Sequence, residues 1–441
     1  MAGQSLSSQP SEGVRVKALR WLTRVGPAFV IAAVVLGPGS VTTMTKMGAT
    51  QGYRMLWLPV AAGALMAGFT LLFMRFGIAA NRSVLQHCAA TWGRPFAALA
   101  GLSMFYVCAA FQFGNNLGVM TSINSLLQRP GQTEPPVAAW VWPVAFNALA
   151  LVFLFGFRRL YTLLERSMTL LVALMLVAFF LNLFFARPSV GGIARGLVPS
   201  LPGETDWALV AGIVATTFSI VAAIFQAYLV RARGWTQADY GKGVADSFSG
   251  IGMLALISTV VMVTSAAVLH PRQITVRTAG DMAVQLESLL GFAAKAVFCI
   301  GLFSAAFSSF VVNAMIGGTL LSDGFGLGED MSSVPARVGT TLCLLIGMVV
   351  AMLIAQWKVV DYAQALVAAQ AGTLLGIPLA ILATLVTLLR PQAAGARPLG
   401  ALGKAFVVLG MAVLVAVTAV SSKSTVVGLR QMLRASSHAG R

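Results

Sequence analysis

Charged residues are scarce in this sequence of 441 residues. Only 10% of them are Asp, Glu, Lys or Arg, whereas a soluble globular protein carries about 25%. Apolar residues make up 58% of the chain, and the mean hydropathy is +0.85. A soluble protein of this length needs a more polar surface. The composition therefore excludes a soluble globular domain and predicts that most of the surface faces lipid.

Cysteine and histidine are also scarce. The four cysteines stand apart without CxxC or Cys/His spacing, and the three histidines do not cluster. These patterns exclude a disulfide framework and a zinc site. The chain also contains no paired nucleophile and base, no GxSxG motif and no P-loop. We therefore expect neither an enzyme nor a bound cofactor.

Long apolar runs dominate the sequence. A membrane-spanning helix needs about 20 mostly apolar residues, and the chain contains enough such runs to predict an all-α polytopic membrane protein. The predicted spans cover residues 26–48, 55–79, 96–127, 137–157, 167–186, 207–230, 247–269, 292–322, 336–356, 362–389 and 402–420.

The basic residues lie in the tails and in the connections between these runs, and they give a net charge of +17. Their expected partners are lipid headgroups of the bilayer, not nucleic acid. More Lys and Arg fall on the side of the N-terminus, so we expect a multi-pass protein of the cell membrane, inner or plasma, with the N-terminus cytoplasmic and the C-terminus outside. The first 25 residues lack a signal-peptide apolar segment. The sequence does not predict the oligomeric state.

Titratable groups are missing from the centres of the predicted spans. All 13 acidic residues and all three histidines fall in connections or near span ends. Carboxylates and imidazoles in the middle of a membrane are the usual parts of proton relays and cation sites. Their absence argues against a carboxylate proton relay through the spans.

The first span is interrupted by the run Gly37, Pro38, Gly39 and Ser40. Gly and Pro disfavour a helix, and a membrane tolerates irregular backbone only where it lines a cavity or is covered by protein. We expect this run to be non-helical and to form part of a substrate site near the middle of the membrane. A packing kink is the alternative, because Gly and Pro are common in membrane helices.

Several motifs follow one another in the order and spacing of a known family. They are Gly26-Pro27, Gly37 to Ser40, Gly52-Tyr53, Arg75 to Ala79, Gly196 to Pro202, Tyr228-Leu229 and Gln370. In this respect most of the chain resembles the NRAMP divalent-metal transporters. The resemblance implies a LeuT-type fold, in which spans 1–5 and 6–10 form inverted repeats, the first and sixth spans are broken, and an eleventh helix follows.

The same resemblance implies the domain organisation. One transporter domain would extend from residue 26 to residue 420, between two tails. Its parts would be a cytoplasmic N-terminal tail at 1–25, repeat one at about 26–186, repeat two at about 207–389, the extra helix at about 402–420 and a C-terminal tail at 421–441.

The chain departs from the family at the positions that bind metal. The first-span motif of the family is Asp-Pro-Gly-Asn, whose Asp and Asn bind the metal, and these positions are Gly37 and Ser40 here. The sixth-span motif Met-Pro-His becomes Ala223, Ile224 and Phe225. The resemblance therefore implies a site without the charged and sulfur-containing ligands of the family.

Two further departures concern the third and sixth spans. The acidic pair that transfers protons in the third span of the family becomes Gln112 and Asn115, which cannot titrate. We expect these amides either to line the substrate site or to join helices by hydrogen bonds. The sixth span has no Gly or Pro between Ser219 and Tyr228, so nothing in its sequence predicts a break there.

Without a carboxylate, a dehydrated divalent cation would lack charge balance, whereas free amides at the start of a half-helix suit an anion. We therefore expect an NRAMP-like secondary transporter for a small anionic or zwitterionic solute. The alternatives are a divalent metal transporter with an altered site, and a non-transporting sensor or inactive relative.

The expected substrate-binding residues come from three spans. They are Gly37, Pro38, Gly39, Ser40, Ala223, Phe225, Gln226, Tyr228 and Gln370. Hydroxyls of the eighth span are candidate ligands for a cation that drives transport, because sodium-coupled transporters of the same fold place such ligands there. Alternatively, these small serines serve only helix packing. These hydroxyls belong to Ser304, Ser308 and Ser309.

Overall fold

The structure is a computed structural model that describes residues 37–128, 137–138, 140–155, 158–203, 205–356 and 361–439. The described residues are helical, with no strand among them. The α-helices are α3 (Pro38–Gln51), α4 (Trp57–Ala79), α5 (Val84–Trp92), α6 (Arg94–Leu127), α7 (Val141–Phe155), α8 (Arg158–Ala186), α9 (Val190–Gly196), α10 (Trp207–Thr217), α11 (Ile220–Ala232), α12 (Tyr240–Val268), α13 (Ala279–Ala283), α14 (Glu287–Leu290), α15 (Ala294–Gly324), α16 (Val334–Gln356), α17 (Tyr362–Gly372), α18 (Ile377–Leu389) and α19 (Ala401–Ala439).

The membrane-spanning prediction agrees with these helices. Eight stretches of the described chain are long and apolar enough to cross a membrane. A ninth is obtained if the end of α8 (Leu170–Ala186) and α9, which is bent from it by 120°, are counted together as one span. Each of the eleven predicted spans coincides with at least one described helix. The first half of the first span, residues 26–36, lies outside the described residues. Helix α19 continues to Ala439, beyond residue 421, where the predicted C-terminal tail begins.

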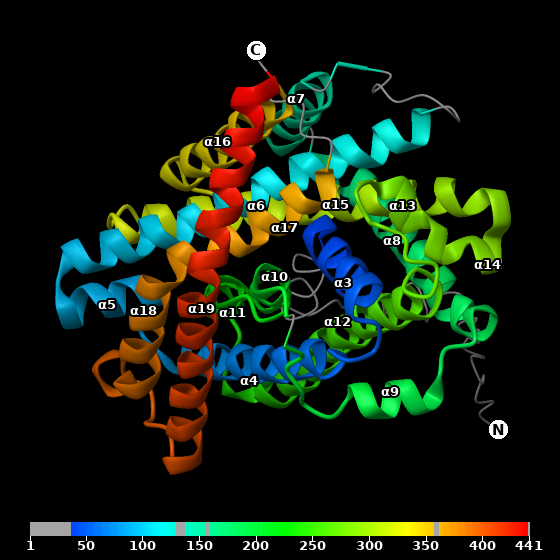
Figure 1. The fold of residues 1–441 in the computed structure, drawn as a ribbon. Coiled ribbons are helices and arrows are strands. Elements are labelled where there is room, and N and C mark those ends of the chain that lie inside the picture. The colour runs from blue at the N-terminus through cyan, green and yellow to red at the C-terminus, as the bar shows by residue number, and fades with distance from the viewer. Residues whose placement is uncertain are drawn as a thin grey trace, which may run out of the picture.

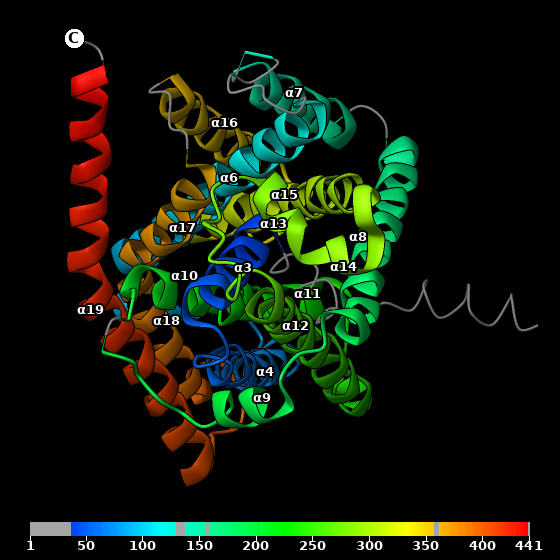
Figure 2. The same cartoon turned by 45° about the vertical axis from the view of Figure 1, so that its right-hand side comes forward.

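Two sets of helices pack beside each other. In the first set, α4 packs against α11 and α12, and α12 also packs against α3. In the second set, α15 packs against α6, α8 and α16, and α16 also packs against α6. The short helix α3 lies at the boundary, because it also contacts α6, α10, α15 and α17 (Figure 1, Figure 2). A ligand at the start of α3 would therefore be in reach of both sets.

Small residues allow the helices of the second set to approach closely. An added Cβ at Gly339 of α16 would lie 2.8 Å from the Cα of Gly318 in α15, and one at Gly101 of α6 would lie 3.0 Å from the Cα of Gly324. Helices in membranes associate through this kind of close van der Waals packing, since lipid provides no hydrophobic driving force between them. The four cysteines are free and buried, as expected for small apolar fillers.

Gly318→Ala should lower the thermal stability of the protein. A Cβ at this position would overlap the backbone of Ala336 and Thr340, so α15 and α16 would have to move apart, and overpacking of this kind costs about 1–3 kcal/mol. Gly252→Ala in α12 is the matched control, because no atom lies within 4 Å of its added Cβ and Ala favours the helix more than Gly. Thermal unfolding in detergent should give a lower Tm only for Gly318→Ala. Equal shifts for both variants would contradict the close packing.

Candidate functional site

Helix α3 begins in the middle of the first predicted span. Gly37 is extended, with φ −92° and ψ −179°, and the helix starts at Pro38. The expected break is therefore present at Gly37, but the expectation that Pro38, Gly39 and Ser40 are non-helical is wrong. Proline is favoured in the first turn of a helix, where its missing N–H costs nothing. The preceding residues lie outside the described chain.

The sixth predicted span is broken although it has no Gly or Pro at the break. Helix α10 ends at Thr217 and α11 begins at Ile220, while Phe218 (φ −105°, ψ 65°) and Ser219 (φ −76°, ψ 96°) leave the helical conformation. Helical hydrogen bonding ends with Phe218 N–H to Val214 O and resumes with Ala223 N–H to Ser219 O. Backbone groups between these bonds leave the helix inside a buried stretch of chain.

The side chain of Gln370 lies against the first turn of α3. A Cβ on Gly39 would overlap the Gln370 amide, and one on Gly114 of α6 would lie 2.7 Å from Gln370 Nε2. On the other side, a Cβ on Gly212 of α10 would lie 3.7 Å from Gln370 Cβ and 2.8 Å from Thr43 Cγ2. Glycine at these positions lets α3, α6, α10 and α17 meet around one amide.

The polar pair of the third predicted span lies beside Gly37. A Cβ on Gly37 would be 3.0 Å from Ser309 Oγ and 3.4 Å from Asn115 Oδ1. Asn115 Nδ2 donates to Gln112 Oε1 (3.1 Å) and to Ser309 Oγ (3.5 Å), and Asn313 Nδ2 donates to Ser309 Oγ (2.8 Å). Gln112 Nε2 donates to the carbonyl of Phe310. These amides therefore join α6 to α15 and also border the start of α3, so both expected uses are compatible with their positions.

Several oxygens at the two breaks are buried and have no hydrogen-bond partner within the described chain. They are Ser40 Oγ on α3, Thr217 Oγ1 at the end of α10 and Gln370 Oε1 on α17. The three helices contact one another. A buried polar atom without a partner costs about 1–3 kcal/mol, so unpartnered oxygens on three helices in mutual contact indicate a position for a ligand or water.

Other predicted residues lie further along α11 and α15. Ala223 is buried one turn into α11, and Gln226 is buried with neither of its amide atoms hydrogen-bonded in the described chain. The ring of Phe225 stacks on Tyr228, with 5.8 Å between the ring centroids. On α15, Ser304 Oγ donates to Ile300 O, which is a bond within its own helix, and Ser308 is half-buried.

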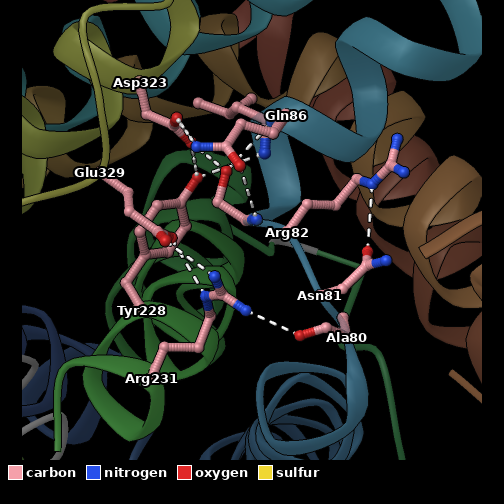
Figure 3. Close-up of polar contacts among 10 residues, drawn as sticks. Ala80, Asn81, Arg82, Gln86, Tyr228, Arg231, Asp323 and Glu329 are labelled. Carbon is pink, nitrogen blue, oxygen red and sulfur yellow. Dashed lines mark hydrogen bonds and ion pairs between the residues drawn. The ribbon is translucent and has the colours of Figure 1, made fainter. Parts of the chain in front are cut away.

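Tyr228 points away from the breaks, towards a carboxylate that was not among the candidate residues predicted from the sequence. Its hydroxyl donates to Asp323 Oδ2 (2.7 Å), in the last turn of α15, and accepts from Leu85 N–H (3.3 Å) (Figure 3). Asp323 is fully buried. Its position just after the apolar run 292–322 made it resemble a residue of a connection. The hydroxyl of Tyr228, which we expected to bind substrate, therefore contacts the end of α15.

The described part of the chain contains no group of three or more His, Cys, Asp or Glu side chains able to hold a metal ion. A surface hollow of about 630 Å³ lies at the far end of α3, between the Gly52 turn and the segment of α9 and Ser200. Its lining includes Arg54, Arg195 and His270 but none of the predicted site residues. We therefore place the candidate site at the helix breaks.

Comparison with known proteins gives a family and a fold. The family described as natural resistance-associated macrophage protein-like (Nramp) matches residues 28–424. A divalent metal cation transporter MntH of Deinococcus radiodurans is 24% identical over 414 residues, which cover 91% of this chain and 89% of the relative. A transporter of the same name from Yersinia enterocolitica is 26% identical over 316 residues, which cover 71% and 74%.

Solved structures of a manganese transporter from Eremococcus coleocola have the same fold. A mutant of that protein superposes with a TM-score of 0.75 at 16% identity, covering 98% of this chain and 93% of the other. Its complex with an aromatic bis-isothiourea substituted compound gives 0.74 at 16% identity, covering 97% and 94%. The fold is accordingly of the LeuT type, as the resemblance implied.

A double-mutant cycle can test the position of Gln370. The three heavy atoms nearest to an added Cβ at Gly39 all belong to Gln370. Gly39→Ala should therefore destabilise the protein by about 1–3 kcal/mol in the presence of Gln370 and by much less in a Gln370→Ala background. Thermal unfolding of the wild type, both single variants and the double variant measures this coupling. Additive effects would show that the Gln370 side chain does not fill the space beside Gly39.

Proposed function

Since this chain belongs to the Nramp family, whose members are membrane transporters, we propose that it carries a divalent metal ion through a central site of neutral oxygen donors. The named relatives are divalent metal cation transporters. These relatives favour transport of a metal ion over transport of the anionic or zwitterionic solute expected from the sequence. The observation that carries the proposal is the set of unpartnered buried oxygens at the two breaks, from Ser40, Thr217 and Gln370.

The donor set favours a hard cation. Hydroxyl, amide and backbone carbonyl oxygens suit Mg²⁺, Ca²⁺ and Mn²⁺, whereas thioether and thiolate sulfur select softer metals. Ala223 stands where the family carries a methionine, so no sulfur from this position selects for a soft metal. We infer that the site prefers Mg²⁺ and Mn²⁺ to softer ions such as Cd²⁺.

The missing carboxylate determines how tightly the ion is held. With Gly37 and Ser40 in the motif of the first span, no negative side chain balances two positive charges there. Removing all water from the ion would therefore be costly. We infer that the ion keeps several of its waters, as Mg²⁺ commonly does in proteins, and that binding is weak.

The start of α3 supports one second candidate. Gly37 provides no side-chain cap for this helix, and the helix contains no acidic residue in its first turn. The positive end of a helix dipole with free N–H groups suits an anion. A small anionic or zwitterionic solute is therefore the second substrate class to test.

Purified full-length protein in liposomes should take up Mn²⁺ or Mg²⁺. Ser40→Ala and Gln370→Ala should each slow this uptake, because each substitution removes one of the proposed oxygen donors. Ser249→Ala and Gln273→Ala are matched controls on exposed residues and should transport as the wild type does. Uptake of a small carboxylate or amino acid in place of every metal ion would overturn the proposal in favour of the second candidate.

Adding back a carboxylate should strengthen metal binding. The side chain in Gly37→Asp would extend towards Ser309 and Asn115, whose polar atoms lie within 3.4 Å of its Cβ. Calorimetry with Mn²⁺ should show a Kd lower by about tenfold or more, since ligand charge is a main determinant of affinity for hard cations. The triple variant with Ser40→Asn and Ala223→Met should bind more tightly still. Gly37→Asn is the neutral control; an equal gain from it would show that charge is not the missing element.

A further inference from the structure

A buried carboxylate joins the two sets of helices at one end of the molecule. Asp323, in the last turn of α15, accepts hydrogen bonds at Oδ2 from Ser83 Oγ (2.5 Å) and Tyr228 Oη (2.7 Å), and at Oδ1 from Gln86 Nε2 (3.3 Å) (Figure 3). Ser83 and Gln86 lie at the start of α5, and Tyr228 lies on α11. In the described chain, α11 and α15 make little other direct contact.

The hydrogen bonds around Asp323 fit the ionised form of its carboxyl group. The hydroxyl of Tyr228 accepts from Leu85 N–H (3.3 Å), and the hydroxyl of Ser83 accepts from Gln86 N–H (3.1 Å). Each hydroxyl therefore has its hydrogen available for the carboxylate. An ionised carboxylate offers only acceptor positions, whereas a protonated one must also donate. Bonds to a charged acceptor are roughly twice as strong as bonds to a neutral one.

The other ionisable groups near Asp323 do not neutralise it directly. Arg231 is bonded to Glu329 (2.8 Å) and to the carbonyl of Ala80 (2.7 Å) (Figure 3). Burial lowers the pKa of the His87 imidazole, so this side chain is neutral at neutral pH. The ionisable groups on the elements packed around Asp323 are Tyr228 and Arg231 of α11, His87 and Cys88 of α5, Arg82 directly before α5, Arg94 of α6, Arg337 of α16, and Glu329 and Asp330 of the loop after α15.

We propose that Asp323 is a proton-binding site that controls the junction between α11 and α15. The ionised carboxylate holds α11 to α5 and α15. A proton added to one of its oxygens forms an O–H that needs an acceptor, weakens the three bonds and releases the junction. Because α11 begins at the break beside Ser219, movement of its far end reaches the central site. As a coupling device this proposal rests on the proposed transport function.

Hydrogen–deuterium exchange of the full-length protein tests the site without requiring transport. The backbone amides of residues 83–92 and 226–234 should exchange faster as the pH falls, after correction for the intrinsic pH dependence of exchange. Asp323→Asn should exchange about tenfold faster than the wild type at high pH, since it lacks charge-assisted bonds, and should show no remaining pH dependence. Asp330→Asn, at an exposed carboxylate of the following loop, should retain the behaviour of the wild type.

Single-donor variants keep the test decisive if Asp323→Asn does not fold. Ser83→Ala and Tyr228→Phe each remove one hydrogen bond that stabilises the ionised form, so the carboxylate takes up a proton more readily. The exchange transition should therefore move to higher pH in both. Glu329→Gln removes a nearby negative charge that disfavours the ionised form of Asp323, so it should move the transition in the opposite direction, to lower pH. A pH-independent wild type, or a transition that persists in Asp323→Asn, would overturn the proposal.

Liposome transport separates this proposal from the proposed function. An inward proton gradient should accelerate metal uptake by the wild type, and this acceleration should be lost in Asp323→Asn while uptake without a gradient persists. If the wild type transports no metal ion, the proposed function fails, and the exchange experiment still decides whether Asp323 controls the junction. If uptake occurs and its proton acceleration survives in Asp323→Asn, Asp323 is not the coupling site.

Discussion

Backbone groups that leave a helix inside a membrane must find partners in the protein or in a ligand, because lipid offers none. This constraint accounts for the centre of the structure. Helix α3 begins directly after Gly37, Phe218 and Ser219 separate α10 from α11, and glycines around Gln370 bring four helices together beside these positions. The resulting site has hydroxyl and amide oxygens without hydrogen-bond partners among the described residues, which is the feature that a bound ion would complete.

Polar side chains join separate helices on either side of this centre. On α3, Lys46 Nζ donates to Gln364 Oε1 (2.6 Å) and lies 3.9 Å from Asp361 Oδ2, at the start of α17. At the other end, Asp323 and Tyr228 join α15 to α11. Charged and polar groups are expensive inside a membrane protein and are therefore rarely placed there without a use. Contacts of this kind at both ends suit a transporter whose central site must open to each side in turn.

The spans, the LeuT-type fold and the break at Gly37 could be predicted because apolar length, motif order and Gly/Pro content are local properties of a sequence. The break at Phe218 could not, because tertiary contacts, and not local propensity, remove these residues from the helix. Asp323 was missed for a related reason. Its position at a helix end resembles a solvated connection, and only the packing of α5 and α11 around it makes it buried. The direction of the Tyr228 side chain was likewise not predictable, because only the packing of α11 against α5 and α15 brings its hydroxyl to Asp323.

The central claim is that neutral oxygens at the two breaks hold a divalent metal ion. The most direct measurement is an anomalous difference map from crystals of the full-length protein grown with Mn²⁺. We expect a peak between the start of α3 and α17, within about 2.0–2.6 Å of Ser40 Oγ or Gln370 Oε1, the range of bonds from hard cations to oxygen. A well-occupied peak elsewhere, with none at the breaks at saturating Mn²⁺, would contradict it.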